Sequence, residues 1–125
     1  MPQLAKMPLM FDPGERFEYG LNTDVLGYLI EVISGKSLDR FFRDEIYAPL
    51  GMVDTYYVNS HGLPAADQVT TARDLATLAK AMIIDHPEQY AIYKEREFTY
   101  NNIRQYNRNT LLAEDPTVDG LKTGH

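Results

Sequence analysis

The sequence contains three serines that could act as hydroxyl nucleophiles in acyl transfer: Ser34, Ser37 and Ser60. A serine that attacks a carbonyl needs a neighbouring base to take its proton and backbone N–H groups to hold the oxyanion. None of the three has a lysine three residues further on, a spacing that places an amine beside the hydroxyl. Lys36 follows Ser34 by only two residues. Ser37 is expected to cap a helix and Ser60 to lie in a loop, so these 125 residues provide no nucleophile.

The sequence has no pattern of metal or cofactor ligands. It contains no cysteine, which excludes disulfides, thiolate nucleophiles and zinc–thiolate sites. His61 and His86 have no partner at the spacing of a metal site, so each is expected to be structural or exposed. We therefore expect no metal and no cofactor. An acidic cluster fits a solvated loop and a helix cap better than a pair of catalytic carboxylates; its members are Asp12, Glu15, Glu18 and Asp24.

The composition is that of one globular domain with an acidic balance. Hydrophobic residues make up 44% of the chain and charged residues 24%. The net charge of −6 argues against a nucleic-acid partner, which needs clustered Lys and Arg. No stretch approaches the ~18 apolar residues of a transmembrane helix, and the N-terminus lacks the apolar run of a signal peptide. We expect a soluble, untargeted chain without a membrane segment, or a segment of a longer, exported precursor.

Two helices are predicted in the first half of the chain. Asn22 is a good N-cap residue before apolar residues at helical spacing, and Gly35 provides a C-cap. A second helix is expected to begin at Ser37 and to stop at Pro49 or Gly51. Because the link between them is short, the two helices should pack as a hairpin.

The second half is expected to hold a long helix and a β-hairpin. Thr70-Thr71 caps the helix, Asp74 supports its first turn, and the helix ends by Pro87. Two β-prone runs flank residues 101–102, a pair of asparagines typical of a tight hairpin turn. Residues 118–123 are expected to form the start of a strand.

Residues 8–57 carry three motifs that resemble one branch of a known superfamily. They are Phe11-Asp12-Pro13-Gly14-Glu15-Arg16-Phe17-Glu18-Tyr19, Ile33-Ser34-Gly35-Lys36-Ser37 and Pro49-Leu50-Gly51-Met52-Val53-Asp54-Thr55. This part is similar to class C β-lactamase-like serine hydrolases and esterases. From this resemblance we expect residues 8–57 to be related to penicillin-recognising enzymes.

Residues 57–125 carry a longer and nearly gap-free set of motifs. They are Asn59-Ser60-His61-Gly62-Leu63, Thr70-Thr71-Ala72-Arg73-Asp74-Leu75-Ala76, Lys94-Glu95-Arg96-Glu97-Phe98-Thr99, Asn107-Arg108-Asn109 and Val118-Asp119-Gly120-Leu121-Lys122-Thr123-Gly124-His125. They are similar to the low-molecular-mass penicillin-binding proteins, the D-alanyl-D-alanine carboxypeptidases. We expect one domain over residues 1–125. Its class C-like and carboxypeptidase-like parts meet near residue 57, in a hybrid chain or in a divergent single family.

The resemblance implies an active site with three elements: Ser-x-x-Lys, a second Ser or Tyr motif, and a Lys-Thr-Gly strand. Lys122-Thr123-Gly124 matches the third element. The Lys122 ammonium would offer positive charge to the terminal carboxylate of a substrate, and the Thr123 hydroxyl would donate a hydrogen bond. Gly124 would let the substrate backbone approach closely. The backbone N–H of His125 would contribute to the oxyanion hole.

The other two elements match less well. In the class C-like branch a tyrosine with a pKa lowered by nearby lysines serves as the general base, and Tyr19 is the candidate that this resemblance implies. The family's Tyr-x-Asn motif is altered here, because Asn22 lies three residues after Tyr19 instead of two. The alternative to a general base is that Tyr19 is a tyrosine packed in a loop. The Ser-x-x-Lys element is missing, and by resemblance it would precede Met1.

The resemblance also implies the fold and the function. We expect a helix-dominated α+β structure, part of a β-lactamase/transpeptidase-like fold, with a small hairpin and little or no central sheet. The implied function is that of a serine-type D-alanyl-D-alanine carboxypeptidase acting on peptidoglycan stem peptides and binding β-lactams, inactive as this chain without Ser-x-x-Lys. A fragment of a class C-like esterase or β-lactamase is one alternative, and a catalytically silent folding module or hybrid is another. The implied location is periplasmic or extracytoplasmic, which the sequence itself does not fix.

Overall fold

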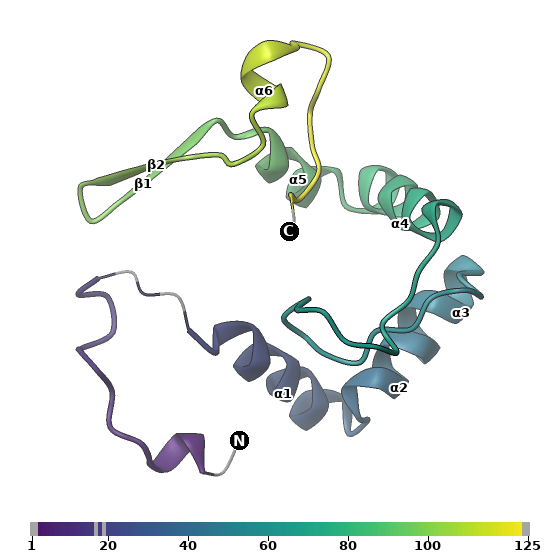
Figure 1. Ribbon diagram of the computed structural model, residues 1–125, viewed down its shortest axis with the longest axis horizontal. Coiled ribbons are helices and arrows are strands. Elements are labelled where there is room, and N and C mark those ends of the chain that lie inside the picture. Colours follow the sequence, from purple (N-terminus) through teal and green to yellow (C-terminus); the bar gives the residue numbers. More distant parts are fainter. Residues whose placement is uncertain (1–2, 17, 19, 124–125) are drawn as a thin grey trace. The chain divides into compact units, whose positions relative to one another are not determined.

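The computed structural model describes residues 3–16, 18 and 20–123 and divides into two compact units, Met1–Thr77 and Leu78–His125 (Figure 1). Helices dominate both units, and the strands of the second form one two-stranded sheet. The expected helix-dominated α+β class with a small hairpin is therefore confirmed. None of the helices in the described part of the chain is long and apolar enough to cross a membrane.

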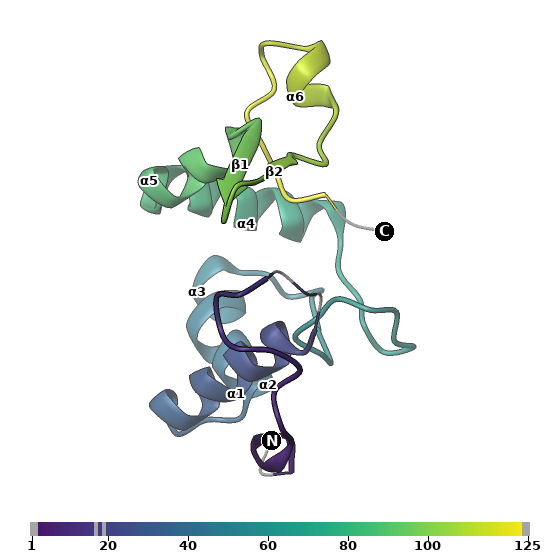
Figure 2. The ribbon, with the colours of Figure 1, turned by 90° about the vertical axis from the view of Figure 1, so that its left-hand side faces the viewer.

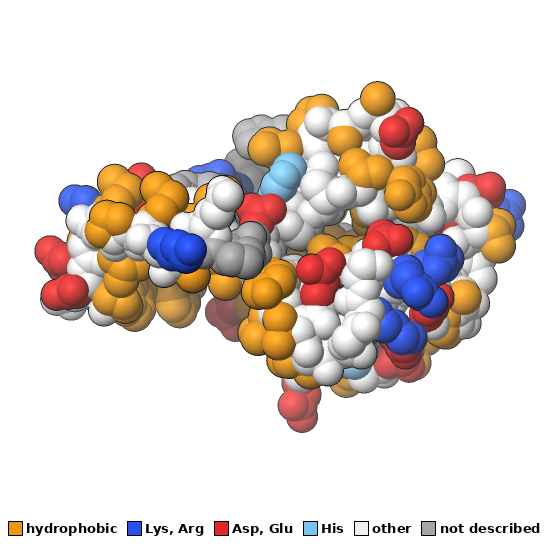
Figure 3. All heavy atoms as spheres, turned by 90° about the horizontal axis from the view of Figure 1, so that it is seen from below, with side chains coloured by type: hydrophobic (Ala, Val, Ile, Leu, Met, Phe, Trp, Pro, Cys, Tyr) orange, Lys and Arg blue, Asp and Glu red, His pale blue; other side chains and the backbone are white. Residues whose placement is uncertain are grey.

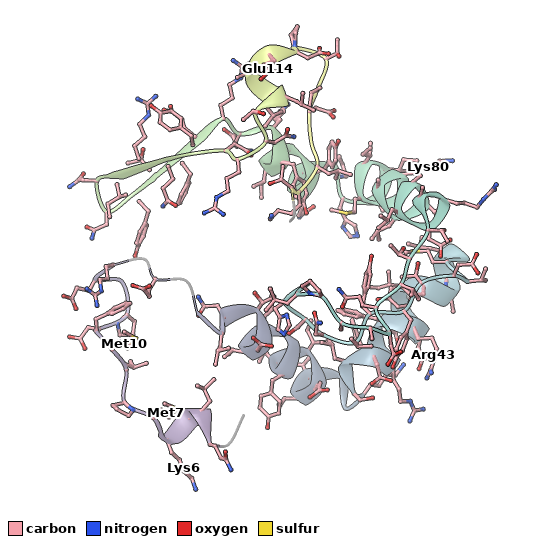
Figure 4. All side chains as sticks on the ribbon, in the orientation of Figure 1. Lys6, Met7, Met10, Arg43, Lys80 and Glu114 are labelled. Atoms are coloured by element: carbon pink, nitrogen blue, oxygen red, sulfur yellow. The ribbon has the colours of Figure 1, made fainter. Side chains whose placement is uncertain are left out.

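The first unit begins with an irregular segment that contains one short 3-10 turn, Leu4–Lys6. In Figure 4 the labelled Lys6, Met7 and Met10 lie along this segment. Met7 and Met10 are 65% and 80% exposed, so neither side chain contributes to a core. The segment leads to the first long helix.

Helix α1, Asn22–Ser34, forms where it was predicted, but Asn22 is its first residue and not its N-cap, because Leu21 holds that position without a side-chain capping bond. It ends because Gly35 adopts a left-handed conformation with φ of 69°, from which its N–H bonds to the carbonyl of Glu31. Glycine has no Cβ and takes this conformation without strain. The predicted C-cap is therefore confirmed.

The second predicted helix is present as three consecutive pieces. They are α2, Leu38–Phe42, a π-helical turn, Arg43–Tyr47, and α3, Ala48–Leu50. Pro49 does not end the helix: it lies inside α3, and Gly51 ends it with φ of 69°. The π turn directly before Pro49 changes the hydrogen-bond pattern, so the missing N–H of the proline is tolerated there.

Two hydrophobic residues, Tyr47 and Met52, are buried in the first unit, with exposed fractions of 7% and 3%. The Tyr47 ring lies 6.1 Å from that of Phe42 and 6.0 Å from that of Tyr57, measured between ring centroids. The Met52 N–H bonds to the Tyr47 carbonyl at 2.8 Å. These contacts join the end of the second helix to the chain that follows it.

A buried carboxylate ties helix α4, Ala72–Asp85, to the preceding loop. Asp74 is 3% exposed, and its Oδ2 accepts hydrogen bonds from the Asp54 N–H at 3.0 Å and the Thr55 hydroxyl at 2.7 Å. The Asp74 N–H donates in turn to Thr71 Oγ1 at 3.1 Å. This last bond confirms the predicted N-cap, because a threonine side chain satisfies an unpaired N–H of the first turn.

The second unit continues from α4 into shorter elements. These are α5, Pro87–Tyr90, a 3-10 turn, Ala91–Lys94, strands β1, Glu97–Tyr100, and β2, Ile103–Tyr106, and α6, Leu111–Glu114. The strands form the antiparallel hairpin labelled in Figure 2, and Tyr100 is paired with Ile103. Asn101 and Asn102 have φ of 49° and 61°, the left-handed pair of a type I′ turn, so the predicted hairpin is confirmed.

At the end of the chain one helix was not predicted and one predicted strand is wrong. Helix α6 was not expected, because a four-residue turn is too short to show periodicity; it forms around Leu112, which is only 4% exposed. Residues 118–123 form no strand. A strand needs a partner for its ladder, and the described part of this unit pairs its strands only with each other.

Many large hydrophobic side chains remain exposed. Figure 3 shows them spread over one face of the molecule, between charged groups. Examples are Ile33 at 78%, Val53 at 85% and Ile92 at 68%. The described part of the chain therefore buries few of its large hydrophobic side chains.

Candidate functional site

The candidate active-site segment is the run that leads to Lys122 and Thr123. Lys122 is exposed and Thr123 is half-buried, and the Lys122 ammonium donates a hydrogen bond to the Thr123 carbonyl. Three other predicted site residues, Tyr19, Gly124 and His125, lie outside the described residues. The structure therefore describes two members of the predicted site, both from the Lys-Thr-Gly element.

Tyr90, the last residue of α5, fixes the start of this segment. Its hydroxyl donates to Asp119 Oδ1 at 2.8 Å. This hydrogen bond is the main cause that raises the pKa of Tyr90 above its ordinary value, because the carboxylate stabilises the protonated phenol. The bond joins residues 29 positions apart in the sequence.

Gly120 is the next point of contact in the segment. A Cβ on Gly120 would lie 2.8 Å from the Tyr90 hydroxyl, closer than real Cβ contacts, and 3.2 Å from the adjacent ring carbon, a tight contact. The Gly120 carbonyl accepts a hydrogen bond from Asn109 Nδ2 at 2.9 Å. A larger residue at this position, two residues before Lys122, would therefore displace the Tyr90 side chain.

Asn107 and Asn109 connect the segment to the 3-10 turn before the hairpin. Asn107 Nδ2 donates to the carbonyls of Tyr93, at 3.1 Å, and Glu95, at 2.8 Å. Its Oδ1 accepts from the Asn109 N–H at 2.9 Å, which orients the amide that binds Gly120. We call Tyr90, Asn107, Asn109 and Asp119 the clamp.

Sequence reasoning did not find the clamp. Asn107, Asn109 and Asp119 were noted only as part of family-like motifs, and Tyr90 was not singled out. The sequence signal for Asn107 and Asn109 is the presence of two asparagines within three residues, because short amide side chains bond readily to nearby backbone groups. The partners of these side chains follow only from the fold.

Arg104 is held inside the hairpin. Its guanidinium forms an ion pair with Glu97 on the opposite strand and lies 4.8 Å from the centroid of the Tyr106 ring. The charge of Arg104 is therefore matched by a neighbouring carboxylate, whereas the described contact of the Lys122 ammonium is with a carbonyl.

A pocket of about 510 Å³ lies in the first unit, between α1, α2 and residues 57–60. Three carboxylates line it, from Asp24, Glu31 and Asp39, and its lining includes no Lys or Arg. A carboxylate-bearing substrate would be repelled by this charge. Its volume is that of a small-molecule site, but its charge is wrong for a substrate that ends in a free carboxylate.

The three serines have structural contacts. The Ser60 hydroxyl donates to Asp24 Oδ1 at 3.0 Å, and Ser37 holds the N-cap position of α2. Ser34 Oγ accepts from the Lys36 N–H at 3.2 Å. The Lys36 ammonium is directed instead to Glu45, at 2.6 Å, and this hydrogen bond is the main cause that raises its pKa. A lysine held protonated in this way is a poor base for a serine.

The comparison with protein families gives one match: a D-alanyl-D-alanine carboxypeptidase family model matches residues 31–125. The match begins in the last turn of α1, before the expected join near residue 57. The position of that join remains a prediction.

Curated relatives are similar over about 60% of the chain. The D-alanyl-D-alanine carboxypeptidase DacC of Escherichia coli is 57% identical over 76 residues, which is 60% of this chain and 19% of that protein. The DacA protein of Haemophilus influenzae is 46% identical over 76 residues, again 60% of this chain and 19% of that protein. This chain thus spans about a fifth of the curated relatives it matches.

Two solved structures extend the likeness to the fold. Penicillin binding protein 5 from Haemophilus influenzae superposes with a TM-score of 0.68 at 39% identity, covering 82% of this chain and 30% of its own. Penicillin binding protein 6B from Escherichia coli gives 0.65 at 40% identity, covering 82% and 33%. The expected resemblance to penicillin-binding carboxypeptidases and to part of their fold is confirmed.

Proposed function

The chain belongs to the D-alanyl-D-alanine carboxypeptidase family, and we propose that it forms the Lys-Thr-Gly side of such an enzyme's active site. The observation that supports this most is the clamp. Tyr90 and Asn109 hold Asp119 and Gly120 at 2.8 and 2.9 Å, which gives the backbone before Lys122 a fixed course. A site that stabilises charge in a transition state depends on such preorganised groups.

In the proposed site each residue has a distinct role. The Lys122 ammonium attracts the terminal carboxylate of the substrate and stabilises negative charge, and the Thr123 hydroxyl donates a hydrogen bond to it. Gly124 allows close approach of the substrate backbone, and the N–H of His125 forms part of the oxyanion hole. Tyr19 is the proposed general base, by its resemblance to the tyrosine of the class C-like branch.

The attacking serine comes from a part of the enzyme outside these 125 residues. Acyl transfer proceeds through attack of a serine hydroxyl on the scissile carbonyl, loss of the leaving group and hydrolysis of the acyl-enzyme. Without that serine the covalent step has no beginning, so the chain alone should be inactive. In this proposal residues 1–125 are part of a single domain, and its class C-like and carboxypeptidase-like parts meet near residue 57.

The proposed substrates are peptidoglycan stem peptides that end in D-alanyl-D-alanine, with β-lactams as acylating analogues. Both carry a carboxylate, which fits the exposed Lys122 ammonium and not the acidic pocket beside α1. The proposed location is accordingly the periplasm or another extracytoplasmic compartment, where this polymer lies.

The test uses a joined protein, in which this chain replaces the matching segment of Haemophilus influenzae penicillin binding protein 5. We expect it to release D-alanine from a stem-peptide mimic. Lys122→Ala should reduce this rate about 100-fold, the typical cost of losing one charge-stabilising donor, and Lys94→Ala should leave it unchanged.

Other outcomes decide between the alternatives. Hydrolysis of a short-chain ester without D-alanine release would favour the esterase assignment. A folded joined protein without either activity would favour a catalytically silent module. D-alanine release that is insensitive to Lys122→Ala would contradict the proposed role of the Lys-Thr-Gly element.

A further inference from the structure

The segment before Lys122 contains a chemically labile pair of residues. Asp119-Gly120 is the single place in the sequence where an aspartate or an asparagine is followed by glycine. At such a pair the backbone nitrogen of the glycine can attack the side-chain Cγ of the aspartate, because glycine has no side chain that blocks the approach. Asp119 is exposed, so its carboxyl group is also accessible to water.

The reaction at this pair needs no reagent other than water. The Gly120 nitrogen bonds to Cγ of the protonated Asp119 carboxyl group, and the hydroxyl group leaves with the amide proton as water. The product is a five-membered succinimide ring. Water then opens the ring at one of its two carbonyls. Attack at the side-chain carbonyl restores aspartate, and attack at the main-chain carbonyl gives isoaspartate, in which the backbone runs through Cβ and Cγ.

The clamp fixes a group on each side of the labile bond. The Tyr90 hydroxyl donates to Asp119 Oδ1 at 2.8 Å, which directs the carboxylate toward the Tyr90 ring. Asn109 Nδ2 donates to the Gly120 carbonyl at 2.9 Å, which fixes the following peptide group. Ring closure requires the carboxyl group to rotate onto the Gly120 nitrogen, and the bond to Tyr90 must break for that rotation. The folded segment therefore opposes the reaction.

We propose that Asp119-Gly120 is a site of spontaneous isoaspartate formation and that the hydrogen bonds from Tyr90 and Asn109 suppress this modification. The modification itself does not depend on the proposed function, but its consequence does. Isoaspartate adds one carbon atom to the backbone ahead of Lys122. The Lys-Thr-Gly element would then no longer be held at its original distance from the clamp.

The other aspartates of the chain are poorer candidates. Asp12 and Asp115 precede proline, whose nitrogen carries no hydrogen and so cannot form the neutral ring. The remaining aspartates all precede a residue with a side chain, which hinders the attacking nitrogen. They are Asp24, Asp39, Asp44, Asp54, Asp67, Asp74 and Asp85. Modification is therefore expected at residue 119 first.

The test ages the 125-residue chain at neutral pH and maps isoaspartate with a protease that cleaves before aspartate but not before isoaspartate. Tyr90→Phe should accelerate modification of residue 119 about fivefold, the factor expected for the loss of one hydrogen bond. The matched control is Tyr93→Phe. It removes a hydroxyl from the neighbouring ring, 5.9 Å away between centroids, and keeps the bond to Asp119, so the rate should not change.

Two further measurements keep the test decisive if Tyr90→Phe does not fold. In urea the clamp is absent, and the unmodified chain should then form isoaspartate at residue 119 at least about tenfold faster than in its folded state. Asp119→Glu should abolish the product at this position, because the corresponding six-membered ring forms far more slowly. This second variant shows that the mapped signal comes from residue 119.

Several results would overturn the inference. They are equal rates for folded Tyr90→Phe and Tyr93→Phe, equal rates for the unmodified chain with and without urea, and isoaspartate that accumulates at other aspartates before residue 119. In the joined protein, loss of acylation by fluorescent penicillin should follow the isoaspartate content. A joined protein that is never acylated contradicts the proposed function alone. Full acylation of modified protein contradicts the stated consequence for Lys122.

Discussion

The two units of the molecule are stabilised by different kinds of contact. Among its described residues, the first contains a buried carboxylate, Asp74, whose Oδ2 accepts two hydrogen bonds, and two buried hydrophobic residues, Tyr47 and Met52. The second contains one buried leucine, Leu112, and the half-exposed hydrogen bonds of the clamp. A buried polar group is costly to leave unpaired, whereas an exposed one can bond to water. Substitutions in the first unit should therefore affect stability most, and substitutions in the clamp should act locally on the Lys122 segment.

The largest effect is expected for Asp74→Ala. It removes the acceptor of the Asp54 N–H and the Thr55 hydroxyl and should lower the free energy of unfolding by about 3–4 kcal/mol, as expected for two bonds to a buried charge. Urea denaturation would measure this. Asp85→Ala, at the exposed end of the same helix, is the control and should have little effect. Similar losses for both would show that the buried carboxylate has no special role.

Leu112→Ala is expected to have the next largest effect. It removes the buried side chain of α6 and should cost about 2–3 kcal/mol in the free energy of unfolding, through lost burial and a cavity. Leu111→Ala changes the neighbouring residue, which is 53% exposed, and should cost much less. If the two variants unfold at the same urea concentration, the second unit is not organised around Leu112.

Tyr47 should make the first unit sensitive to alkaline pH. Burial raises the pKa of Tyr47 to about 12 in the folded state, above the value near 10 of an unfolded chain. The folded state therefore retains the proton longer. The resulting stabilisation is complete below pH 10 and is lost between pH 10 and about 12, and by pH 11 the loss is about 1 kcal/mol.

The variant that tests this is Tyr47→Phe. It removes a buried hydroxyl that has no hydrogen-bond partner among the described residues, so stability at pH 7 should be equal or higher. Its stability should also fall less between pH 9 and pH 11 than that of the unmodified chain. Tyr100→Phe, at a residue 48% exposed, should keep the original pH dependence. Parallel alkaline curves for all three proteins would rule out the burial effect.

The smallest effect on stability is expected for Asn109→Ala. It removes the 2.9 Å hydrogen bond to the Gly120 carbonyl and should cost about 1 kcal/mol. The local effect should be larger: amide hydrogen exchange of residues 119–122 should accelerate at least tenfold. Thr110→Ala is the control, since the Thr110 side chain makes no capping bond to α6. Unchanged exchange at 119–122 would show that the clamp does not hold this segment.

The local elements were largely predictable from the sequence. Gly35 and the asparagine pair at 101–102 are strong signals because the left-handed conformations they adopt exclude most other residues. Asp74 was recognised as a first-turn acid, but its burial depends on Asp54 and Thr55, 20 and 19 residues earlier. Local patterns do not contain such partners.

The site and the direction of α1 were harder to predict for the same physical reason. The clamp joins Tyr90 to Asp119 across 29 residues, and no periodicity records that contact. The pattern of α1 shows that Val25 and Leu29 share a face. It does not show that this face points away from the unit, because that depends on the packing of Gly27 against Leu38.

The most direct test of the proposed function is the rate at which fluorescent penicillin acylates the joined protein. We predict covalent labelling of the unmodified joined protein, a rate about 100-fold lower for Lys122→Ala, and an unchanged rate for Lys94→Ala. The 125-residue chain alone should remain unlabelled because none of its serines has a lysine three residues on. Equal rates for the Lys122 and Lys94 variants, or a covalent adduct on the isolated chain, would contradict the proposed function.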